Sequence, residues 1–380
     1  MLLLLNLADG MVSTLASAYA GSLGYPLADI GLIVALYSVA SLASRLPSAR
    51  LADGKSAHAW LVASCIIFTA TLAVYPLATQ TWALTTVRIL HGMSFGAATT
   101  LNMATFLAVC TPANRGTATA LFTAAWSGGY SIGNFIAGVI ADNYGFSAAF
   151  VGAAIFPLLA IFATPRIEPS PISHDSHMPG TWRVLLHPDV RAVPLLAFNV
   201  NFLNALLTTL FPLYVLAIGL TLSIAGSARA LQSLTNTLVR PISGPLIRRM
   251  GPLQLGTAGV VLTSAAIVCI PLSTAPLVLL GLFVVVGAGR AVGVVANATG
   301  TLDLSSKGVL KRGTASALMS AGGDTGNILA PLLAGATAAA INLGPAMQVL
   351  AIATALGGIA AVLTRGSTRS DSAAVSPSSS

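Results

Sequence analysis

The sequence predicts an all-α integral membrane protein with twelve transmembrane helices in two similar six-helix bundles. The first observation is composition: 55% of the 380 residues are hydrophobic and only 7% are charged, whereas soluble domains carry about 25% charged residues. The second is a series of long apolar segments, and the third is a repeat with a period near half the chain. A chain so poor in charge lacks the polar surface of a soluble protein, so that class is excluded.

Twelve segments are long and apolar enough to cross a bilayer, which takes about 20 mostly apolar residues. The first is interpreted as a retained helix and not as a signal peptide, because no basic residue precedes it and Asp9 lies inside it. Polar residues, prolines and glycines separate the segments. The predicted spans are residues 2–20, 28–46, 59–77, 82–108, 116–140, 146–163, 191–216, 222–243, 253–272, 276–299, 313–339 and 344–363.

Basic residues predict the orientation of these spans. Alternate loops contain no Lys or Arg, while the loops between them are basic. Because cytoplasmic loops carry an excess of Lys and Arg, we expect both termini to be cytoplasmic and the protein to lie in the cell membrane. The same pattern explains the net charge of +8 without a nucleic-acid partner. The basic loops and adjoining helix ends hold Arg45, Arg50, Lys55, Arg115, Arg166, Arg183, Arg248, Arg249, Lys307, Lys311, Arg312, Arg365 and Arg369.

A repeat divides the chain into two halves. The segment RGTATALF, which begins at Arg115, returns as RGTASALM from Arg312, and Gly133-Asn134 returns as Gly326-Asn327. Between these landmarks the second copy is about one helical turn shorter. A repeat of this period indicates two related bundles. The predicted organisation is a bundle over 1–163, a cytoplasmic linker over 164–190, a second bundle over 191–365 and a disordered cytoplasmic tail over 366–380.

Three local motifs accompany this organisation. SRLPSARLADGKSAHAW follows the second span, and RPISGPLIRRMGP follows the eighth, so that Arg45 corresponds to Arg240. The fourth span contains Arg88-x3-Gly92-x3-Gly96. The fifth contains Gly129, Gly133 and Gly138.

Together these motifs resemble those of the major facilitator superfamily over nearly the whole chain. Leu51, Ala52 and Asp53 match the family's loop between helices 2 and 3, whereas Ala49 and Gly54 depart from it. In the fifth span Asn134 stands where the family's antiporter-associated glycine motif has proline. The eleventh span contains Pro331, but five residues after Gly326 and so not at the motif's position.

The resemblance implies two bundles that rock about a central site. It implies a cytoplasmic gate in which a carboxylate accepts hydrogen bonds or pairs with an arginine, formed by Arg50, Asp53, Arg240 and Arg248. The alternative interpretation is a topology signal with helix capping. It also implies close helix packing between the bundles at Gly129, Gly133, Gly138, Gly326 and Pro331. Ordinary helix packing is the alternative there.

Five charged residues lie within predicted spans and away from their ends: Asp9, Arg88, Arg229, Arg290 and Asp324. A charge at bilayer depth costs at least about 2.5–3.5 kcal/mol, so such a residue faces a cavity, pairs with another charge or serves function. In the family the first helix of each three-helix unit lines the cavity. Asn201, Asn204 and Thr208 form a polar stripe on the seventh span. The predicted substrate or coupling residues are Asp9, Arg88, Asn201, Asn204, Arg290 and Asp324.

Asp324 or Asp9 is the predicted proton site. Burial favours the neutral form of a carboxyl group and a nearby arginine favours the charged form, so a balanced carboxylate can take up and release a proton. The alternative is a static pair with Arg290, Arg88 or Arg229. Two further expectations concern His91 and Arg229. His91 is interpreted as a packing residue, with proton coupling as the alternative, and Arg229 is expected to pair with Asp142, with anion binding as the alternative.

The predicted function is secondary active transport by alternating access. No nucleotide-binding motif is present, so an ion gradient, most simply of protons, is the expected energy source. The helix-5 glycines favour efflux of a small, largely apolar compound. Uptake of a small organic anion is the alternative, and a non-transporting sensor or scaffold is an alternative of another class.

An enzyme is not expected, because no nucleophile–base pair is visible. Neither the three cysteines nor the three histidines of 164–190 have the pattern of a metal site, and no cofactor is expected. The predicted partners are a small-molecule substrate, protons and the lipid bilayer, and the chain is expected to be a monomer.

Overall fold

The computed structural model describes residues 1–52, 56–109, 115–164, 188–306, 310 and 312–374. Within these ranges the secondary structure is helical throughout, with eleven α-helices and two short 3-10 helices, η1 (Tyr75–Leu77) and η3 (Ile270–Leu272). The α-helices are α1 (Leu2–Ser22), α2 (Leu27–Ala52), α3 (Ala57–Val74), α4 (Thr81–Val109), α5 (Arg115–Phe162), α6 (Pro188–Ala217), α7 (Leu222–Met250), α8 (Pro252–Cys269), α9 (Pro276–Ser306), α10 (Arg312–Ile341) and α11 (Leu343–Ala374).

Helix α5 is interrupted at Gly145, where two helical segments meet. The backbone there has φ 82° and ψ 170°, a conformation that glycine adopts without the steric penalty of a side chain. Uninterrupted, a helix of 48 residues would be about 70 Å long, more than twice the hydrocarbon thickness of a bilayer. The break therefore separates two segments that correspond to the predicted fifth and sixth spans.

Eight helices are long and apolar enough to cross a membrane, counting Thr117–Phe162 as one. Helices α4, α7 and α10 are absent from this set, and α7 contains Arg229, Arg240, Arg248 and Arg249. The helical, multi-span character predicted from the sequence is confirmed, while the number twelve stays a prediction.

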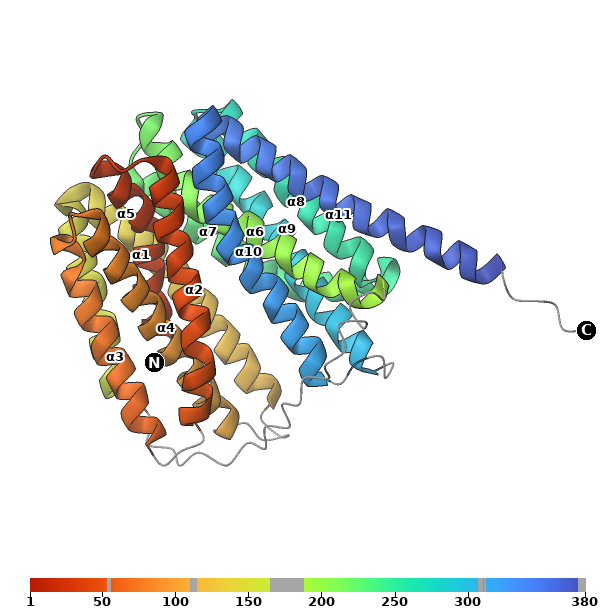
Figure 1. Ribbon diagram of the computed structural model, residues 1–380, viewed down its shortest axis with the longest axis horizontal. Helices are drawn as coiled ribbons and strands as arrows, with labels where there is room; N and C mark the ends of the chain where they lie inside the picture. The colour runs from red at the N-terminus through yellow and green to blue at the C-terminus, as the bar shows by residue number, and fades with distance from the viewer. Residues whose placement is uncertain (53–55, 110–114, 165–187, 307–309, 311, 375–380) are drawn as a thin grey trace, which may run out of the picture.

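The two largest buried cores correspond to the two halves of the chain. The first is built almost entirely from α1–α5 and includes Phe68, Tyr75 and Phe150. The second is built from α6–α11 and includes Phe211 and Phe283. Figure 1 shows the two groups of helices side by side, with α2 next to α10 where they meet.

The most extensive contacts between the halves are made by α2 with α10 and by α5 with α7, and α1 also contacts α6. A Cβ added at Gly31 would overlap the Pro331 carbonyl oxygen and lie 2.9 Å from the Gly335 Cα. A Cβ at Gly138 would overlap the Leu222 carbonyl oxygen. Backbones approach this closely only because the side chain is missing. These contacts lie at the helix ends opposite the basic loops.

Three of the five residues expected to pack between the bundles pack within one bundle instead. Gly129 and Gly133 of α5 lie against the carbonyl oxygens of Leu3 and Leu7 in α1, and Gly326 of α10 lies against Phe198 in α6. The motif marks tight backbone contact, but the rotation of each helix determines which neighbour is contacted. Only Gly138 and Pro331 of the predicted set lie against the other half.

Two predicted boundaries differ from the structure at the ends of the second bundle. Helix α6 begins at Pro188, and most of the predicted linker lies outside the described residues. Helix α11 continues to Ala374, through most of the segment predicted to be a disordered tail. No proline between Pro345 and Pro377 forces that helix to stop earlier.

Candidate functional site

A polar cavity of about 300 Å³ lies between the halves and is lined by helices from both. A second hollow of about 360 Å³ adjoins it and shares Arg45, Asn201, Arg240, Arg290, Asp324 and Asn327. All six predicted substrate or coupling residues line the cavity: Asp9, Arg88, Asn201, Asn204, Arg290 and Asp324.

Helical periodicity explains how α6 and α7 present polar stripes to this cavity. Asn201, Asn204 and Thr208 all line it, as their spacing predicts. On α7 the lining residues are Arg229, Ser233, Asn236 and Arg240, which also recur on one face. Helices 2, 5, 8 and 11 of the sequence count (α2, α5, α7 and α10) therefore line the cavity beside the four helices that the resemblance implied.

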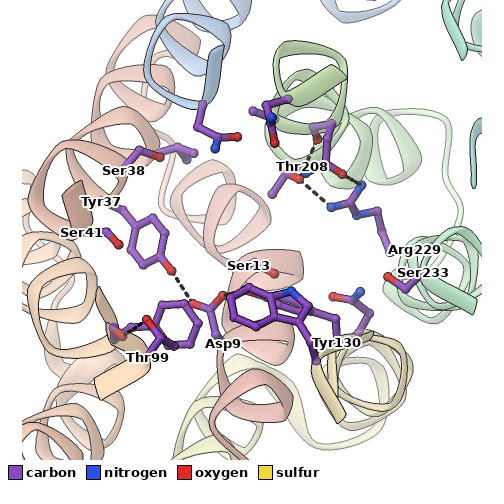
Figure 2. A pocket seen from close by; sticks show the side chains of 18 of the residues that line it. Asp9, Ser13, Tyr37, Ser38, Ser41, Thr99, Tyr130, Thr208, Arg229 and Ser233 are labelled. Carbon is purple, nitrogen blue, oxygen red and sulfur yellow. Dashed lines mark hydrogen bonds between the residues drawn. The ribbon is translucent and has the colours of Figure 1, made fainter. Parts of the chain in front are cut away.

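Asp9 is the centre of a buried hydrogen-bonded cluster in the first half. Its side chain is almost fully buried, at 3% exposure. Tyr37 donates to Oδ1 at 2.7 Å and Tyr130 donates to Oδ2 at 2.5 Å. His91 Nε2 lies 3.1 Å from Oδ1. Figure 2 shows Tyr37 reaching Asp9 from α2 and Tyr130 reaching it from α5.

His91 was expected to be a packing residue, and the structure places it against Asp9 as well. Its ring stacks on Phe68 with centroids 5.1 Å apart, and Nδ1 is 2.9 Å from the Tyr75 hydroxyl. Both ring nitrogens therefore face polar partners. This buried histidine both packs and belongs to the carboxylate cluster.

Arg88 borders the same cluster without a direct carboxylate contact. Its guanidinium carbon lies 4.6 Å from the centre of the Tyr37 ring, a cation–π distance. One of its nitrogens donates to the Tyr75 hydroxyl at 3.4 Å. Arg88 thus lies over the Tyr37 ring while Asp9 accepts from the Tyr37 hydroxyl, so the two charged groups contact the same buried side chain.

Arg229 lies on α7 in the second half, and its side chain reaches toward α6 at the wall of the cavity (Figure 2). It donates to Thr208 at 2.7 Å, to Gln232 at 2.5 Å and to Asn204 at 3.3 Å. All three acceptors are neutral. They hold the guanidinium in one orientation and leave its charge uncompensated.

The predicted pairing of Arg229 with Asp142 is wrong. The Asp142 carboxylate accepts hydrogen bonds from the backbone N–H groups of Leu222 and Ser223, at 2.9 and 2.7 Å, and from the Ser223 hydroxyl. These are the unpaired amides at the beginning of α7, where a negative charge is favoured. The N-terminus of α7, two turns before Arg229, therefore binds the Asp142 carboxylate in place of the Arg229 side chain.

Asp324 pairs with Arg45 across the two halves. The distances from Arg45 Nη1 are 3.2 Å to Oδ1 and 3.4 Å to Oδ2. Asp324 is 15% exposed and Arg45 is 47% exposed. The predicted alternatives for a static pair, Arg290, Arg88 and Arg229, are not its ion-pair partners among the described residues.

The predicted gate residues do not form one cluster in the described part of the chain. Arg50 and Arg248 lie exposed near the ends of α2 and α7, and Asp53 lies outside the described residues. Arg240 lines the cavity with its Nε buried. Arg240 lies more than two turns before the end of α7. It corresponds in the repeat to Arg45, which also lines the cavity.

The cavity has an excess of positive charge. Five arginines line it, Arg45, Arg88, Arg229, Arg240 and Arg290, against the two carboxylates of Asp9 and Asp324. Within the described residues, no group of three or more His, Cys, Asp or Glu side chains could hold a metal ion. The arrangement can bind anions through charge-assisted hydrogen bonds.

Sequence reasoning did not assign Tyr37, Tyr130, Gln232 or Arg45 to the site. The first three carry no charge, and each lies on a helix that was not expected to line the cavity. For Arg45 a signal did exist, since its correspondence with Arg240 was visible in the repeat.

Comparison with known proteins agrees with this architecture. The profile of the Major Facilitator Superfamily matches residues 1–310 and residues 219–380. The chain is 22% identical over 310 residues to the uncharacterized MFS-type transporter MJ1560 of Methanocaldococcus jannaschii, covering 79% of each protein.

Solved structures with the same fold include a bacterial homolog of the human lysosomal transporter Spinster in its inward-facing, occupied conformation. That structure has a TM-score of 0.76 and 16% identity, with 95% of this chain and 93% of the other covered. The nucleoside transporter NupG has a TM-score of 0.75 and 14% identity, with 95% and 96% covered. The chain belongs to the Major Facilitator Superfamily.

Proposed function

We propose that this protein is a secondary transporter that moves a small organic anion across the membrane by alternating access. One observation carries the substrate class: the cavity between the halves has five arginines and only two carboxylates. Buried cationic charge is costly at bilayer depth, so an anion that enters the cavity is stabilised by it.

The polar lining favours this substrate over the apolar compound that the sequence first suggested. Beside the charged groups, the wall presents hydroxyl and amide groups such as Ser13, Ser41, Thr99, Asn201 and Asn327. An apolar solute would desolvate these groups without replacing their hydrogen bonds. A hydrophilic anion would replace them.

The contacts between the halves support alternating access. Close packing at Gly31–Gly335 and Gly138–Leu222 lies on one side of the cavity, opposite the basic helix ends. If the basic ends are cytoplasmic, as the loop charges predict, the structure corresponds to an inward-facing state. The Asp142–Ser223 contact crosses the interface on the closely packed side and would break as the halves rock, whereas the Arg45–Asp324 pair crosses it on the side of the basic helix ends.

Asp9 is the proposed proton site. In the present arrangement its two oxygens accept from Tyr37 and Tyr130. A proton on either oxygen would convert an acceptor into a donor and displace one of these hydroxyls. Protonation is thereby tied to the contacts that α1 makes with α2 and α5. Asp324, which is held by Arg45, is the second candidate.

We further propose export in exchange for protons. Support comes only from the glycines of α5, which resemble an antiporter motif. Proton-driven uptake of the anion is the alternative. The protein would act as a monomer in the cell membrane, with both termini in the cytoplasm.

Transport by the full chain in proteoliposomes tests the substrate class. Mixtures of anionic, cationic and neutral solutes of similar size are offered under an imposed proton gradient, and the accumulated compounds are identified by mass spectrometry. We expect anions to accumulate, and Arg290→Gln to reduce accumulation by about tenfold or more, as for loss of one charge-assisted contact. Arg249→Gln, an exposed residue at the end of α7, is the matched control.

The direction follows from the sign of the gradient. An antiporter fills vesicles that have an acidic lumen, and a symporter fills vesicles in an acidic medium. Accumulation of only cations or apolar neutral compounds would overturn the anion proposal. Accumulation of no solute of any class would instead favour a sensor or scaffold.

A further inference from the structure

The five cavity arginines fall into two groups with different surroundings. In the first half, Arg45 pairs with Asp324, and Arg88 shares the Tyr37 ring with Asp9. The second half contributes Arg229, Arg240 and Arg290. Within the described residues no carboxylate lies within ion-pair distance of any of these three.

The surroundings of these three arginines favour binding of an anionic ligand over a permanent ion pair within the protein. Arg229 is oriented by the neutral groups of Asn204, Thr208 and Gln232. Arg240 and Arg290 each have a buried Nε without a hydrogen-bond partner among the described residues, as does Arg88 in the first half. A buried donor without a partner is unfavourable, and a ligand that accepts from it removes that cost.

Arg290 of α9 also lies close enough to Arg229 and to Arg240 for like-charge repulsion with each of them. A ligand with one negative charge could lie close to only one of these two arginine pairs and would offset the repulsion within that pair alone. A ligand with two separated charges could relieve both.

Helix geometry separates the outer two arginines. Arg229 and Arg240 lie on the same face of α7, eleven residues apart, which is about 16 Å along the axis. A single phosphate group is too small to contact both. Arg290 approaches from α9 and lines both hollows of the cavity.

We propose that the transported anion carries two acidic groups separated by a carbon chain, one bound near Arg229 and the other near Arg240, with Arg290 between them. Guanidinium groups match carboxylates in bidentate geometry. The first half then forms a wall in which Arg45 is paired with Asp324 and Arg88 lies over the ring of Tyr37. This inference rests on the proposed function and specifies its substrate.

Binding to the purified full-length protein tests the inference. Linear diacids from succinate to sebacate are compared with monocarboxylates of equal length, with glucose 6-phosphate and with inorganic phosphate, using the shift of the thermal unfolding midpoint. We expect at least one diacid to bind at least about tenfold more tightly than the monocarboxylate of equal length, since an additional charge-assisted contact is made.

Variants locate the two acidic groups. Arg229→Gln and Arg240→Gln should each weaken diacid binding by about tenfold. A monocarboxylate occupies only one of the two positions, so at least one of these two variants should bind the matching monocarboxylate within about threefold of the unmodified protein. Arg249→Gln should change neither. Arg229→Lys and Arg240→Lys keep the charge and should restore part of the affinity, which a purely structural role would not predict.

The outcomes separate this inference from the proposed function. Equal or tighter binding of monocarboxylates, or preference for either phosphate compound, would overturn the diacid proposal and leave the anion transporter intact. Binding of no diacid at millimolar concentration would also overturn it. Preference for neutral solutes in the transport assay would overturn both.

Discussion

Arg45 of α2 and Asp324 of α10 join the two halves of the protein through an ion pair of 3.2 Å, although 279 residues separate them in sequence. The pair lies at the cavity wall, on the side of the basic helix ends. Arg45 and Arg240 occupy corresponding positions in the repeat. Arg240 has no carboxylate within ion-pair distance among the described residues, so only Arg45 has such a partner.

Breaking this pair should change transport more than stability. Arg45 is 47% exposed, so Asp324→Asn should lower the free energy of unfolding by no more than about 1 kcal/mol. The change should slow transport, because a contact between moving halves is lost. A double-mutant cycle with Arg45→Gln measures the coupling between the two residues. Equal effects of Asp324→Asn with and without Arg45 would contradict a role for the pair.

Asp9→Asn should uncouple transport from the proton gradient. Asparagine keeps one accepting oxygen for Tyr37 or Tyr130 but cannot exchange a proton. Gradient-driven accumulation should be lost, while exchange of labelled for unlabelled substrate continues. Gradient-driven accumulation at the normal rate in this variant would exclude Asp9 as the proton site, and Asp324→Asn then becomes the decisive variant.

Gly31→Ala should destabilise the contact between α2 and α10. The added methyl group would overlap the Pro331 carbonyl oxygen, and overpacking of this kind costs about 1–3 kcal/mol. The free energy of unfolding and the transport rate should both fall.

Gly281→Ala in α9 is the matched control, because an added Cβ there meets nothing within 4 Å. Alanine favours a helix over glycine by about 0.5–1 kcal/mol, so this variant should be slightly more stable. If Gly31→Ala changes neither the free energy of unfolding nor the transport rate, α2 and α10 separate readily at this point.

Asp142→Ala should weaken the start of α7. The variant removes the acceptor of two backbone amides and of the Ser223 hydroxyl, and loss of such a cap costs about 0.5–2 kcal/mol. Thermal unfolding measures this loss, with Asn143→Ala at the exposed neighbouring position as control.

A second readout separates capping from closure of the halves. Because Asp142 and Ser223 belong to different halves, Asp142→Ala should also increase labelling of a cysteine introduced at Ser13 from the side opposite the basic loops. Increased labelling from the basic side alone would contradict the assignment of this contact to closure.

The helices and their limits were largely predictable, because each depends on a local property. Apolar length identified the segments, and the repeat divided them into two halves. Gly145 was placed in a loop, and the structure has the break of α5 there. The charged residues within the spans also followed from local sequence, since a charge in an apolar segment is conspicuous without any knowledge of its neighbours.

Partners were not predictable in the same way. Asp142 was matched to Arg229 on position along the helices, but the backbone amides of Leu222 and Ser223 bind it instead. Gly129 and Gly133 were assigned to the interface between the halves, but helix α5 turns these residues toward α1. Both errors arose because sequence spacing gives the depth of a residue in a helix bundle and not the direction in which it faces.

The sequence by itself indicated a multi-span membrane protein of two related halves, with five charged residues inside its apolar segments: Asp9, Arg88, Arg229, Arg290 and Asp324. Only the tertiary structure decided that Tyr37 and Tyr130 hold Asp9, that Arg45 holds Asp324 and that three arginines of the second half have no carboxylate partner among the described residues. Hydropathy and charge are properties of single positions. Pairing depends on the rotation and register of helices packed from distant parts of the chain, and those are set by the whole fold.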